Sequence, residues 1–354
     1  MNNLITPIVT INYNGREDTC DLIGSLIKSG DLFSLVVVDN CSPRENEFEN
    51  LKKEIHEKFG IIFSDSQFND PSVTACLFGP FENGSSVFLL RSSNNGGFSK
   101  GTNIGLRFAF SIFPKTEFIA ILNNDTIVTS HFLRNAISPM EDNKILAVMG
   151  TILYYGYDHP YIWSIGGRID WVKGQGIHEH KDEILDISSE KRDVVYRTFI
   201  SGCFTVFRSS ALKSIGLLDE SYFFAGEEYQ YSVDLCKKGK IAWVPSSVIY
   251  HKSVLGIGNG SSHNIKSLPW QWNAYMVKIC FVNKNKAFLF RKFWHLLLRA
   301  HINVRIKKQY LSSGITKKDF SLFRSSLFKN INRISYDSND FLAFKSLFPA
   351  EKKS

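Results

Sequence analysis

The sequence has no apolar run of the roughly 18 or more residues that a membrane-spanning helix needs. Its first residues also lack a basic segment followed by an apolar one, so we expect no secretory signal. The 6 cysteines are scattered, and none forms a C-x-x-C pair. This spacing argues against a disulfide framework or a zinc site and fits a reducing compartment. The sequence therefore predicts a cytoplasmic protein.

The chain has 354 residues, of which 44% are hydrophobic and 21% charged, so it is globular and long enough for a large core. Its net charge of +8 is unevenly placed. From Lys284 to the end, 16 Lys and Arg face 4 Asp and Glu, a net +12; the remainder has 26 against 30, a net −4. This asymmetry predicts an anionic partner for the tail, either a membrane surface or a nucleic acid.

Two short apolar runs end abruptly on acidic, amide-rich residues. Phe118–Leu122 is followed by Asn-Asn-Asp125, and the run from Leu35 ends at Asp39. Such runs are typical of buried parallel strands, and ligands of open α/β sheets bind beyond the carboxyl ends of these strands. We therefore expect Asp39 and Asp125 to share a site for a polar ligand and a divalent cation.

The first third of the chain alternates between strand and helix patterns, which predicts a nucleotide-binding α/β half with right-handed crossovers. A stretch rich in Asn, Asp, Ser, Pro and Gly, Ser64–Ser86, interrupts it and predicts a loop insertion. The expected elements are strand Pro7–Asn14, helix Arg16–Ser29, strand Leu35–Asp39, helix Glu45–Phe59, strand Val87–Leu90, helix Leu106–Ile112 and strand Phe118–Leu122.

The following residues predict a mixed sheet, then a glycine-rich loop at 256–263 and a basic, largely helical tail. The expected elements are strands within Ala147–Tyr155, Val194–Phe207, Ile241–Pro245 and Val248–His251, and helices Ser210–Ile215 and Glu227–Lys238.

Each candidate residue has a structural alternative. Asp125 suits Mg²⁺ or Mn²⁺, which prefer oxygen ligands, but an acid near a helix start can also be a cap. Asp39 can bind a ribose or base, or form an Asx turn. The glycine-rich stretch Gly96–Gly105 lacks the spacing of known phosphate loops and could serve only a tight turn. A lone His251 is more often structural than a ligand.

The strongest cluster is Tyr222–Tyr231, where Glu227 and Glu228 follow an aromatic run and a glycine. Acids at a helix start are favoured by the helix dipole, which is the structural explanation. A carboxylate in such an aromatic setting can also serve as a general base, because burial tunes its pKa. The aromatic setting favours the second interpretation.

Seven segments, in order, resemble the family-2 glycosyltransferases of the GT-A fold, over residues 7–285. The resemblance is to bacterial enzymes of cell-envelope glycans such as O-antigen or capsule, including a rhamnosyltransferase-like branch. The segments are Ile8–Gly15, Val36–Ser42, Asn95–Gly105, Ile121–Asp125, Ser201–Cys203, Gly226–Glu228 and Val244–His251.

The resemblance implies a role for each matching residue. Glu228 would be the catalytic base, and Asp125 with His251 would hold Mg²⁺ or Mn²⁺. The acceptor side would comprise Ser201, Gly202, Cys203 and Glu227. The nucleotide sugar would be bound by Asn12, Asp39, Asn40, Gly97, Asn103 and Asn124.

The chain departs from the family pattern at several positions. Asn123 replaces the first acid of the D-x-D motif, so fewer carboxylates would bind a metal. Glu228 stands where the family has Asp, and Gln230 replaces an acid often found there. Pro43 and the Ser64–Ser86 insertion also differ.

The expected reaction is an inverting transfer from dTDP-rhamnose or a UDP-sugar to a hydroxyl of a glycan or lipid-linked acceptor. A sugar-nucleotide pyrophosphorylase is a second possibility, but Asn12–Arg16 does not match its loop after the first strand. An inactive scaffold or an anionic-surface-binding protein of the same fold is a third. The expected parts are a catalytic domain at 1–263 and a helical basic region at 264–354.

The tail contains apolar residues that fall largely on one side of a helix, surrounded by Lys and Arg. A basic amphipathic helix of this kind can lie in a membrane interface, whereas most amphipathic helices pack on their own protein. We expect a peripheral membrane contact at the inner face of the cell membrane and no nucleic-acid partner. The apolar residues are Phe290, Phe293, Trp294, Leu297, Leu298, Ile302 and Ile306.

Overall fold

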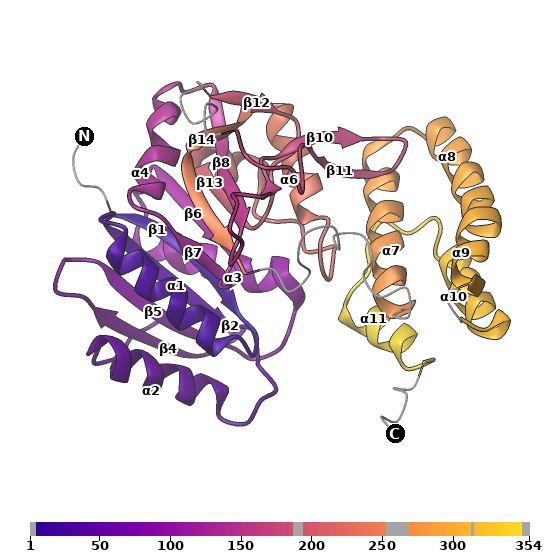
Figure 1. Cartoon of the computed structure of the whole chain (residues 1–354). Coiled ribbons are helices and arrows are strands. Elements are labelled where there is room, and N and C mark those ends of the chain that lie inside the picture. Colours follow the sequence, from indigo (N-terminus) through magenta and orange to yellow (C-terminus); the bar gives the residue numbers. More distant parts are fainter. Residues whose placement is uncertain (1–4, 187–193, 253–267, 313–314, 349–354) are drawn as a thin grey trace.

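The computed structural model describes residues 5–186, 194–252, 268–312 and 315–348. A sheet flanked by helices forms one part of the molecule, and a group of helices from the end of the chain forms the other (Figure 1). The expected α/β architecture with a helical C-terminal region is thus confirmed.

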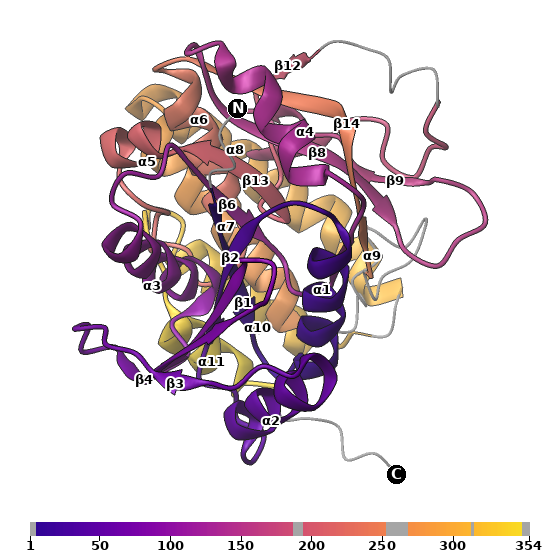
Figure 2. The ribbon, with the colours of Figure 1, turned by 90° about the vertical axis from the view of Figure 1, so that its left-hand side faces the viewer.

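The first half of the sheet is parallel, as the alternating pattern predicted. Strands β1, β2, β5 and β6 pair in the order β6-β1-β2-β5, and all pairs are parallel. Helices α1 and α2 lie on one side of these strands and α3 on the other (Figure 2). The elements are β1 Thr6–Asn12, α1 Arg16–Lys28, β2 Phe33–Asp39, α2 Glu47–Phe59, β5 Ser86–Ser92, α3 Gly97–Ile112 and β6 Phe118–Leu122.

The prediction of a loop at Ser64–Ser86 is wrong. The segment contains β3 (Ser64–Asp65) and β4 (Val73–Pro80), which extend the sheet edge: β4 pairs antiparallel with β5, and β3 antiparallel with β4. Phe78 of β4 packs on Phe88 of β5, with ring centroids 4.9 Å apart. The turn-forming residues that suggested a loop lie at the two ends of β4, where they hid the short strand between them.

The sheet continues beyond β6 with mixed polarity, as expected. Strand β13 pairs antiparallel with β6, and β8, β14 and β12 follow outward. β7 pairs with β14, β9 with β8, and β10 with β11 in a separate hairpin. The elements are β7 Thr126–Val128, α4 Phe132–Ile137, a 3₁₀ turn Ser138–Glu141, β8 Ile145–Tyr154, β9 Ile162–Ser164, β10 Gly167–Asp170, β11 Gln175–His178, β12 Val195–Arg197, β13 Phe204–Arg208, α5 Ser209–Ile215, α6 Glu227–Cys236 and β14 Lys240–His251.

Two strands that the sequence predicted separately, Ile241–Pro245 and Val248–His251, form the single strand β14. The register with β8 shifts between Val244 and Val248. Pro245 lies in this interval and has no N–H to donate, which is why the pairing slips there without ending.

The C-terminal helices build a second apolar core that is distinct from the core around the sheet. The largest side chains of this core include Trp272, Phe281, Phe323 and Tyr336. No helix among the described residues is long and apolar enough to cross a membrane. The helices are α7 Leu268–Asn285, α8 Phe288–His301, a π-helical turn Ile302–Ile306, α9 Lys307–Ser312, α10 Lys317–Lys329 and α11 Ser338–Lys345.

Residues of the sheet-centred part also belong to the second core. Tyr222 is buried in it, and Phe223 and Tyr229 pack against it. The helices α7 and α11 therefore pack on the segment that leads into α6. The expected boundary at 263/264 and the glycine loop at 256–263 lie outside the described residues, so the two-domain division stays a prediction.

Candidate active site

The carboxyl ends of three parallel strands place the predicted polar residues along one edge of the sheet. Asn12 at the end of β1 is the register partner of Asp39 at the end of β2. β6 ends beside β1, and Asn123–Asp125 follow it. Because β13 is antiparallel to β6, its amino end lies at the same edge, with Phe204 opposite Leu122. The sheet thus brings the 201–203 turn to the same place.

A chain of hydrogen bonds joins the three strand ends. The buried carboxylate of Asp39 accepts from Asn12 Nδ2 at 2.9 Å and from Ser42 Oγ at 2.5 Å. Thr19 Oγ1 donates to Asn12 Oδ1 at 3.1 Å, and Asn124 Nδ2 donates to Thr19 Oγ1 at 3.0 Å. Asp39 and Asn124, which lie far apart in the sequence, are therefore fixed relative to one another.

Asp125 and His251 lie in direct contact. His251 Nε2 is 3.1 Å from Asp125 Oδ2. The backbone fixes this pair, because Thr126 is the register partner of His251 and Lys252 N donates to Asp125 O at 2.8 Å. The Asp125 side chain is 30% exposed and that of His251 only 8%. Asp125 therefore faces the open edge, with the imidazole behind it.

Glu227 and Glu228 begin α6, as predicted, after a backbone turn in the left-handed region. Ala225 has φ of 63° and Gly226 of 96°. Glu228 is partly exposed, and its Oε2 accepts from Gly202 N at 3.2 Å. Glu227 is buried, and its Oε2 has no hydrogen-bond partner among the described residues.

Burial raises the pKa of both carboxyl groups above the usual range of a glutamate. The negative charge of Glu228 raises the pKa of Glu227 further, whereas the N–H of Gly202 opposes the rise for Glu228. A partly exposed carboxylate with a raised pKa is suited to accept a proton near neutral pH.

Asp125 and Glu228 approach the same turn, Ser201–Cys203. Burial raises the pKa of the Cys203 thiol well above its ordinary value, and the charges of Asp125 and Glu228 raise it further. Gly202 of this turn donates its N–H to Glu228 Oε2 at 3.2 Å. Cys203 O also accepts from Asn123 N at 2.8 Å, which ties the turn to the end of β6. The predicted metal residue and the predicted base thus border one region.

Comparison with known proteins gives the family. Residues 8–216, more than half of the chain, match the model of glycosyl transferase family 2, and residues 118–327 match that of glycosyl transferase family group 2. The chain belongs to glycosyl transferase family 2. The expected enzyme class, a glycosyltransferase, is confirmed at the level of the family. No curated protein matches the sequence.

Two solved structures show what the fold of this family-2 chain resembles. GalNAc-T7 with UDP, GalNAc and Mn²⁺ gives a TM-score of 0.58 at 17% identity, covering 93% of this chain and 57% of that chain. Residues 1–349 of S. aureus TarS give 0.49 at 13% identity, covering 99% and 93%. The first likeness supports the GT-A fold, and the second score is too low to carry an argument.

The glycine-rich turn at the start of α3 packs directly on Phe223, in the segment before Glu227 and Glu228. Gly97 has φ of 86°, and a Cβ there would lie 2.0 Å from the carbonyl oxygen of Phe223. Asn40 Nδ2 donates to Gly97 O at 3.0 Å and to Asn95 Oδ1 at 3.1 Å. Glycine is required here for close approach of two backbones. The predicted donor contacts of Gly97 and Asn40 stay predictions.

The Asn103 side chain links α3 to the segment before α6 by hydrogen bonds. Its Nδ2 donates to Leu218 O and Glu220 Oε1, both at 2.8 Å, and its Oδ1 accepts from Leu218 N at 2.9 Å. Both amide hydrogens are used within the chain, and the predicted contact of Asn103 with the nucleotide sugar stays a prediction.

Ser201 and Cys203 are also buried, and Cys203 N donates to Ser201 Oγ at 3.2 Å. They shape the turn that presents Gly202 N to Glu228. Their predicted acceptor-side roles, with those of Gly202 and Glu227, stay predictions.

Asp125 and His251 fit a metal that takes most of its ligands from a substrate. Among the described residues, no group of three or more His, Cys, Asp or Glu could hold an ion. Mg²⁺ is often bound through one or two carboxylates together with substrate phosphates and water. His251 Nε2 is 3.1 Å from Asp125 Oδ2, so it is the ring nitrogen that could bind an ion together with this carboxylate.

Sequence reasoning missed Thr19, Ser42 and Lys252. Thr19 and Ser42 link the predicted residues, but single hydroxyls give no signal in one sequence. Lys252 Nζ donates to Asp18 at 2.9 Å and to Asp21 at 2.5 Å, which joins the end of β14 to α1. Its position directly after His251 is the only sequence feature that could have suggested it.

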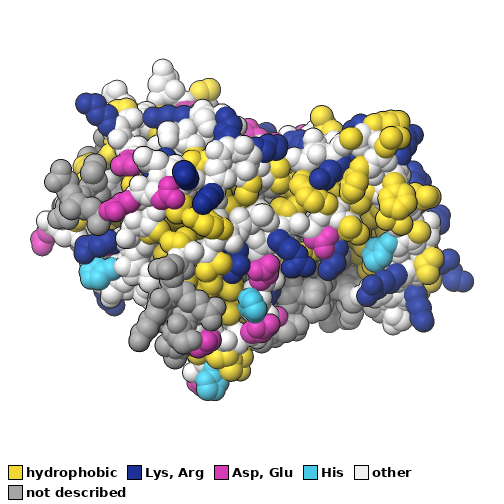
Figure 3. Space-filling view, turned by 90° about the horizontal axis from the view of Figure 1, so that it is seen from above, with side chains coloured by type: hydrophobic (Ala, Val, Ile, Leu, Met, Phe, Trp, Pro, Cys, Tyr) yellow, Lys and Arg dark blue, Asp and Glu magenta, His cyan; other side chains and the backbone are white. Residues whose placement is uncertain are grey.

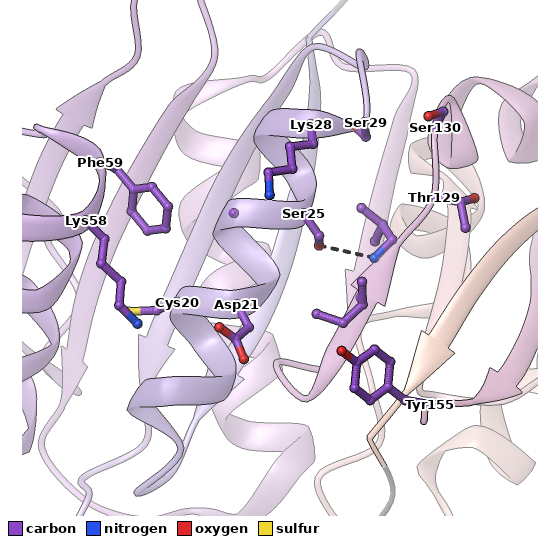
Figure 4. A pocket seen from close by; sticks show the side chains of 13 residues that line it. Cys20, Asp21, Ser25, Lys28, Ser29, Lys58, Phe59, Thr129, Ser130 and Tyr155 are labelled. Atoms are coloured by element: carbon purple, nitrogen blue, oxygen red, sulfur yellow. Dashed lines mark hydrogen bonds between the residues drawn. The ribbon is translucent and has the colours of Figure 1, made fainter. Parts of the chain in front are cut away.

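A cavity of about 780 Å³ lies elsewhere, between α1 and β7 (Figure 4). Its lining includes Asp21, Lys28, Lys58 and Tyr155. It contains none of the predicted site residues, and its one hydrogen bond drawn in Figure 4, from Val128 N to Ser25 Oγ at 3.1 Å, only fixes β7 to α1. The predicted site residues lie at the strand edge and not in this cavity.

Proposed function

We propose that this chain moves a sugar from a nucleotide-diphosphate donor to a hydroxyl group of a glycan or lipid-linked acceptor, with inversion at the anomeric carbon. The observation that carries the proposal is that the turn Ser201–Cys203 contacts both halves of the site, at the edge where Asp39 also lies. Gly202 N donates to Glu228 Oε2 at 3.2 Å, and Cys203 O accepts at 2.8 Å from the N–H of Asn123, two residues before Asp125. A donor diphosphate at Asp125 and an acceptor hydroxyl at Glu228 would then be neighbours.

The donor half of the site is the linked group at the ends of β1, β2 and β6. Asp39 and Asn12 are held rigidly by Ser42 and Thr19, as a binding site for a ribose or base requires. UDP is present in the structure of GalNAc-T7, which supports a nucleotide donor. dTDP-rhamnose or a UDP-sugar is the donor that we propose.

A divalent ion, Mg²⁺ or Mn²⁺, is part of the proposal because GalNAc-T7 was solved with Mn²⁺. Asp125 and His251 would hold it. When bound, such an ion stabilises the negative charge that develops on the leaving diphosphate.

Glu228 is the proposed base. Its carboxylate would accept the proton of the acceptor hydroxyl while that oxygen attacks the anomeric carbon from the side opposite the diphosphate. The bond to the diphosphate oxygen breaks as the new glycosidic bond forms, which inverts the configuration. The N–H of Gly202 orients the carboxylate.

We propose that the enzyme acts in the cytoplasm, at the inner face of the cell membrane, in the synthesis of a cell-envelope polysaccharide such as O-antigen or capsule. A lipid-linked acceptor would be presented at that surface. The basic tail supports this location, since anionic lipids attract Lys and Arg.

The test is a screen for release of nucleoside diphosphate from UDP-, GDP- and dTDP-sugars with Mn²⁺, using the full chain. One donor should be turned over above background, and Glu228→Gln should abolish that turnover. Binding of a donor without turnover in the presence of any acceptor would favour the inactive scaffold instead.

A further inference from the structure

Helix α8 has two apolar faces, and only one of them is packed. Trp294 and Leu298 are buried in the second core, and Ile302 follows them in the π-helical turn. Trp294 Nε1 also donates to Val172 O at 2.9 Å, which anchors α8 to the β10–β11 hairpin. These apolar residues of the tail therefore pack on the protein itself and are not available to a membrane.

The second apolar face of α8 is open to solvent. Four of its side chains, from Leu289 to Leu297, have the i, i+4, i+7 and i+8 spacing of one helix side. The fifth, Val304, lies in the π-helical turn that follows. Phe290 is also partly exposed. The seven apolar residues that the sequence placed on one side are thus divided between two. The exposed face consists of Leu289 (80% exposed), Phe293 (61%), Leu296 (64%), Leu297 (44%) and Val304 (73%).

The segment that contains this open face carries basic and no acidic residues. From Leu235 to Lys318 the sequence has no Asp or Glu. Lys292, Arg305, Lys307 and Lys308 are exposed, and none of them forms an ion pair with an acid in the described part of the chain. Figure 3 shows hydrophobic side chains mixed with Lys and Arg at the end of the molecule that the C-terminal helices form.

We propose that the open face of α8 lies on an anionic lipid surface. Apolar side chains on a helix enter the boundary between headgroups and acyl chains, and flanking cations pair with lipid phosphates. The charge decides between partners. In a symmetric pair of copies this face would meet itself, so the Lys and Arg of one copy would oppose those of the other. A nucleic acid would satisfy the charges but leave the exposed Phe and Leu uncovered.

Binding of α8 to lipid does not depend on the sugar transfer, but it would position the active site for that reaction. α7 continues into α8, and α7 also contacts the segment before Glu228: Asn273 Nδ2 donates to Phe224 O at 2.9 Å. A membrane-bound α8 therefore holds the active site at a fixed distance from the lipid surface, where a lipid-linked acceptor would be found.

The experiment is sedimentation of the full chain with vesicles of phosphatidylcholine alone and of phosphatidylcholine with phosphatidylglycerol. The wild type should sediment with the anionic vesicles and much less with the neutral ones. Phe293→Glu with Leu296→Glu should reduce anionic-vesicle affinity by roughly tenfold or more, because two large apolar side chains lose their burial. Circular dichroism and the melting temperature check that this variant is folded.

The matched control is Ile62→Glu with Ile184→Glu, which makes the same charge change at two other exposed residues, 76% and 54% exposed. It should bind as the wild type does. A charge variant, Arg305→Gln with Lys308→Gln, should weaken binding to anionic vesicles only. Both results would support docking on a lipid surface.

Three results would overturn the proposal: no binding of the wild type to anionic vesicles, equal loss in the control pair, or a wild-type dimer that Phe293→Glu with Leu296→Glu separates while vesicle binding stays absent. Turnover of a water-soluble acceptor should not change in the α8 variant. That readout separates failure of the docking from failure of the proposed transfer reaction.

Discussion

At the scale of single residues, the site depends on carboxylates that the fold holds away from water. Asp39 is buried but receives donors from Asn12 and Ser42, so its charge is compensated. Glu227 is equally buried, and its Oε2 has no partner among the described residues. An uncompensated buried carboxyl destabilises the fold, and such groups are found preferentially at functional sites.

Glu227→Gln should stabilise the protein at neutral and alkaline pH. Because burial raises the pKa of Glu227 in the folded state, that state holds the proton more tightly than the unfolded chain. Stability should therefore fall in the wild type as pH rises above the usual glutamate pKa, and the variant should escape this loss. We expect a gain of roughly 1–3 kcal/mol in the free energy of unfolding.

Thermal or urea unfolding from acidic to alkaline pH checks this expectation. Glu57→Gln, at an exposed position of α2, is the control and should leave the pH dependence unchanged. A variant less stable than the wild type at alkaline pH would contradict the account of Glu227.

The pH dependence of turnover should report the raised pKa of Glu228. A general base acts in its deprotonated form, so kcat/KM should decline as pH falls through this pKa. The acidic limb should lie above the pH expected of an ordinary glutamate, since burial raises the pKa. Glu227→Gln should leave the limb in place, because burial and the charge of Glu228 raise the pKa of Glu227 further, so Glu227 still holds its proton when Glu228 loses its own. A limb at the pH of an ordinary glutamate would contradict Glu228 as a buried base.

At the scale of elements, the sequence predicted the part of the site that follows from strand ends. Asp39 and Asp125 were expected at one edge because each ends an apolar run, and the parallel pairing of β1, β2 and β6 puts them there. The hairpin β3–β4 was not predicted, because its turn residues outnumber its apolar ones. The hydrogen bonds of Thr19 and Asn103 could not be predicted, since they join elements whose approach only the folded chain defines.

Removal of the metal should act through the ends of β6 and β14, where Asp125 and His251 meet. Donor affinity measured by calorimetry with Mn²⁺ should fall by roughly tenfold or more when EDTA is added, because the diphosphate loses its countercharge. Asp125→Asn should show the weak affinity with or without EDTA. Asp142→Asn, in an exposed loop, should behave as the wild type does. Equal donor affinity of the wild type in both conditions would remove the metal from the account.

At the scale of the whole molecule, the C-terminal helices hold the segment that leads to Glu227 and the proposed base Glu228. Asn273 Nδ2 donates to Phe224 O, and Tyr336 OH donates to Asn273 Oδ1 at 2.9 Å. Lys284 pairs with Asp219, at the start of the same segment. The helices therefore support the segment before the proposed base, and a chain cut at Lys284 would expose Tyr222 and Phe281 of the second core.

Asn273→Ala should lower kcat more than it changes the KM for the donor. The substitution removes two hydrogen bonds and leaves Tyr336 OH with Phe224 O, at 3.3 Å, so we expect a loss of roughly 1 kcal/mol in stability and a displaced Glu228. Steady-state kinetics and unfolding measure the two effects. Asn303→Ala, on the exposed side of the π-helical turn, is the control. A stability loss with unchanged kcat would show that the helices support the fold but do not position the base.

The measurement that tests the central claim most directly is the rate of sugar transfer by Glu228→Gln, with donor affinity determined on the same sample. Gln keeps the shape of the side chain but cannot accept the acceptor proton. The account predicts a kcat lower by roughly 10²–10⁴-fold with donor affinity unchanged. A Glu228→Gln enzyme that transfers sugar at the wild-type rate would contradict it.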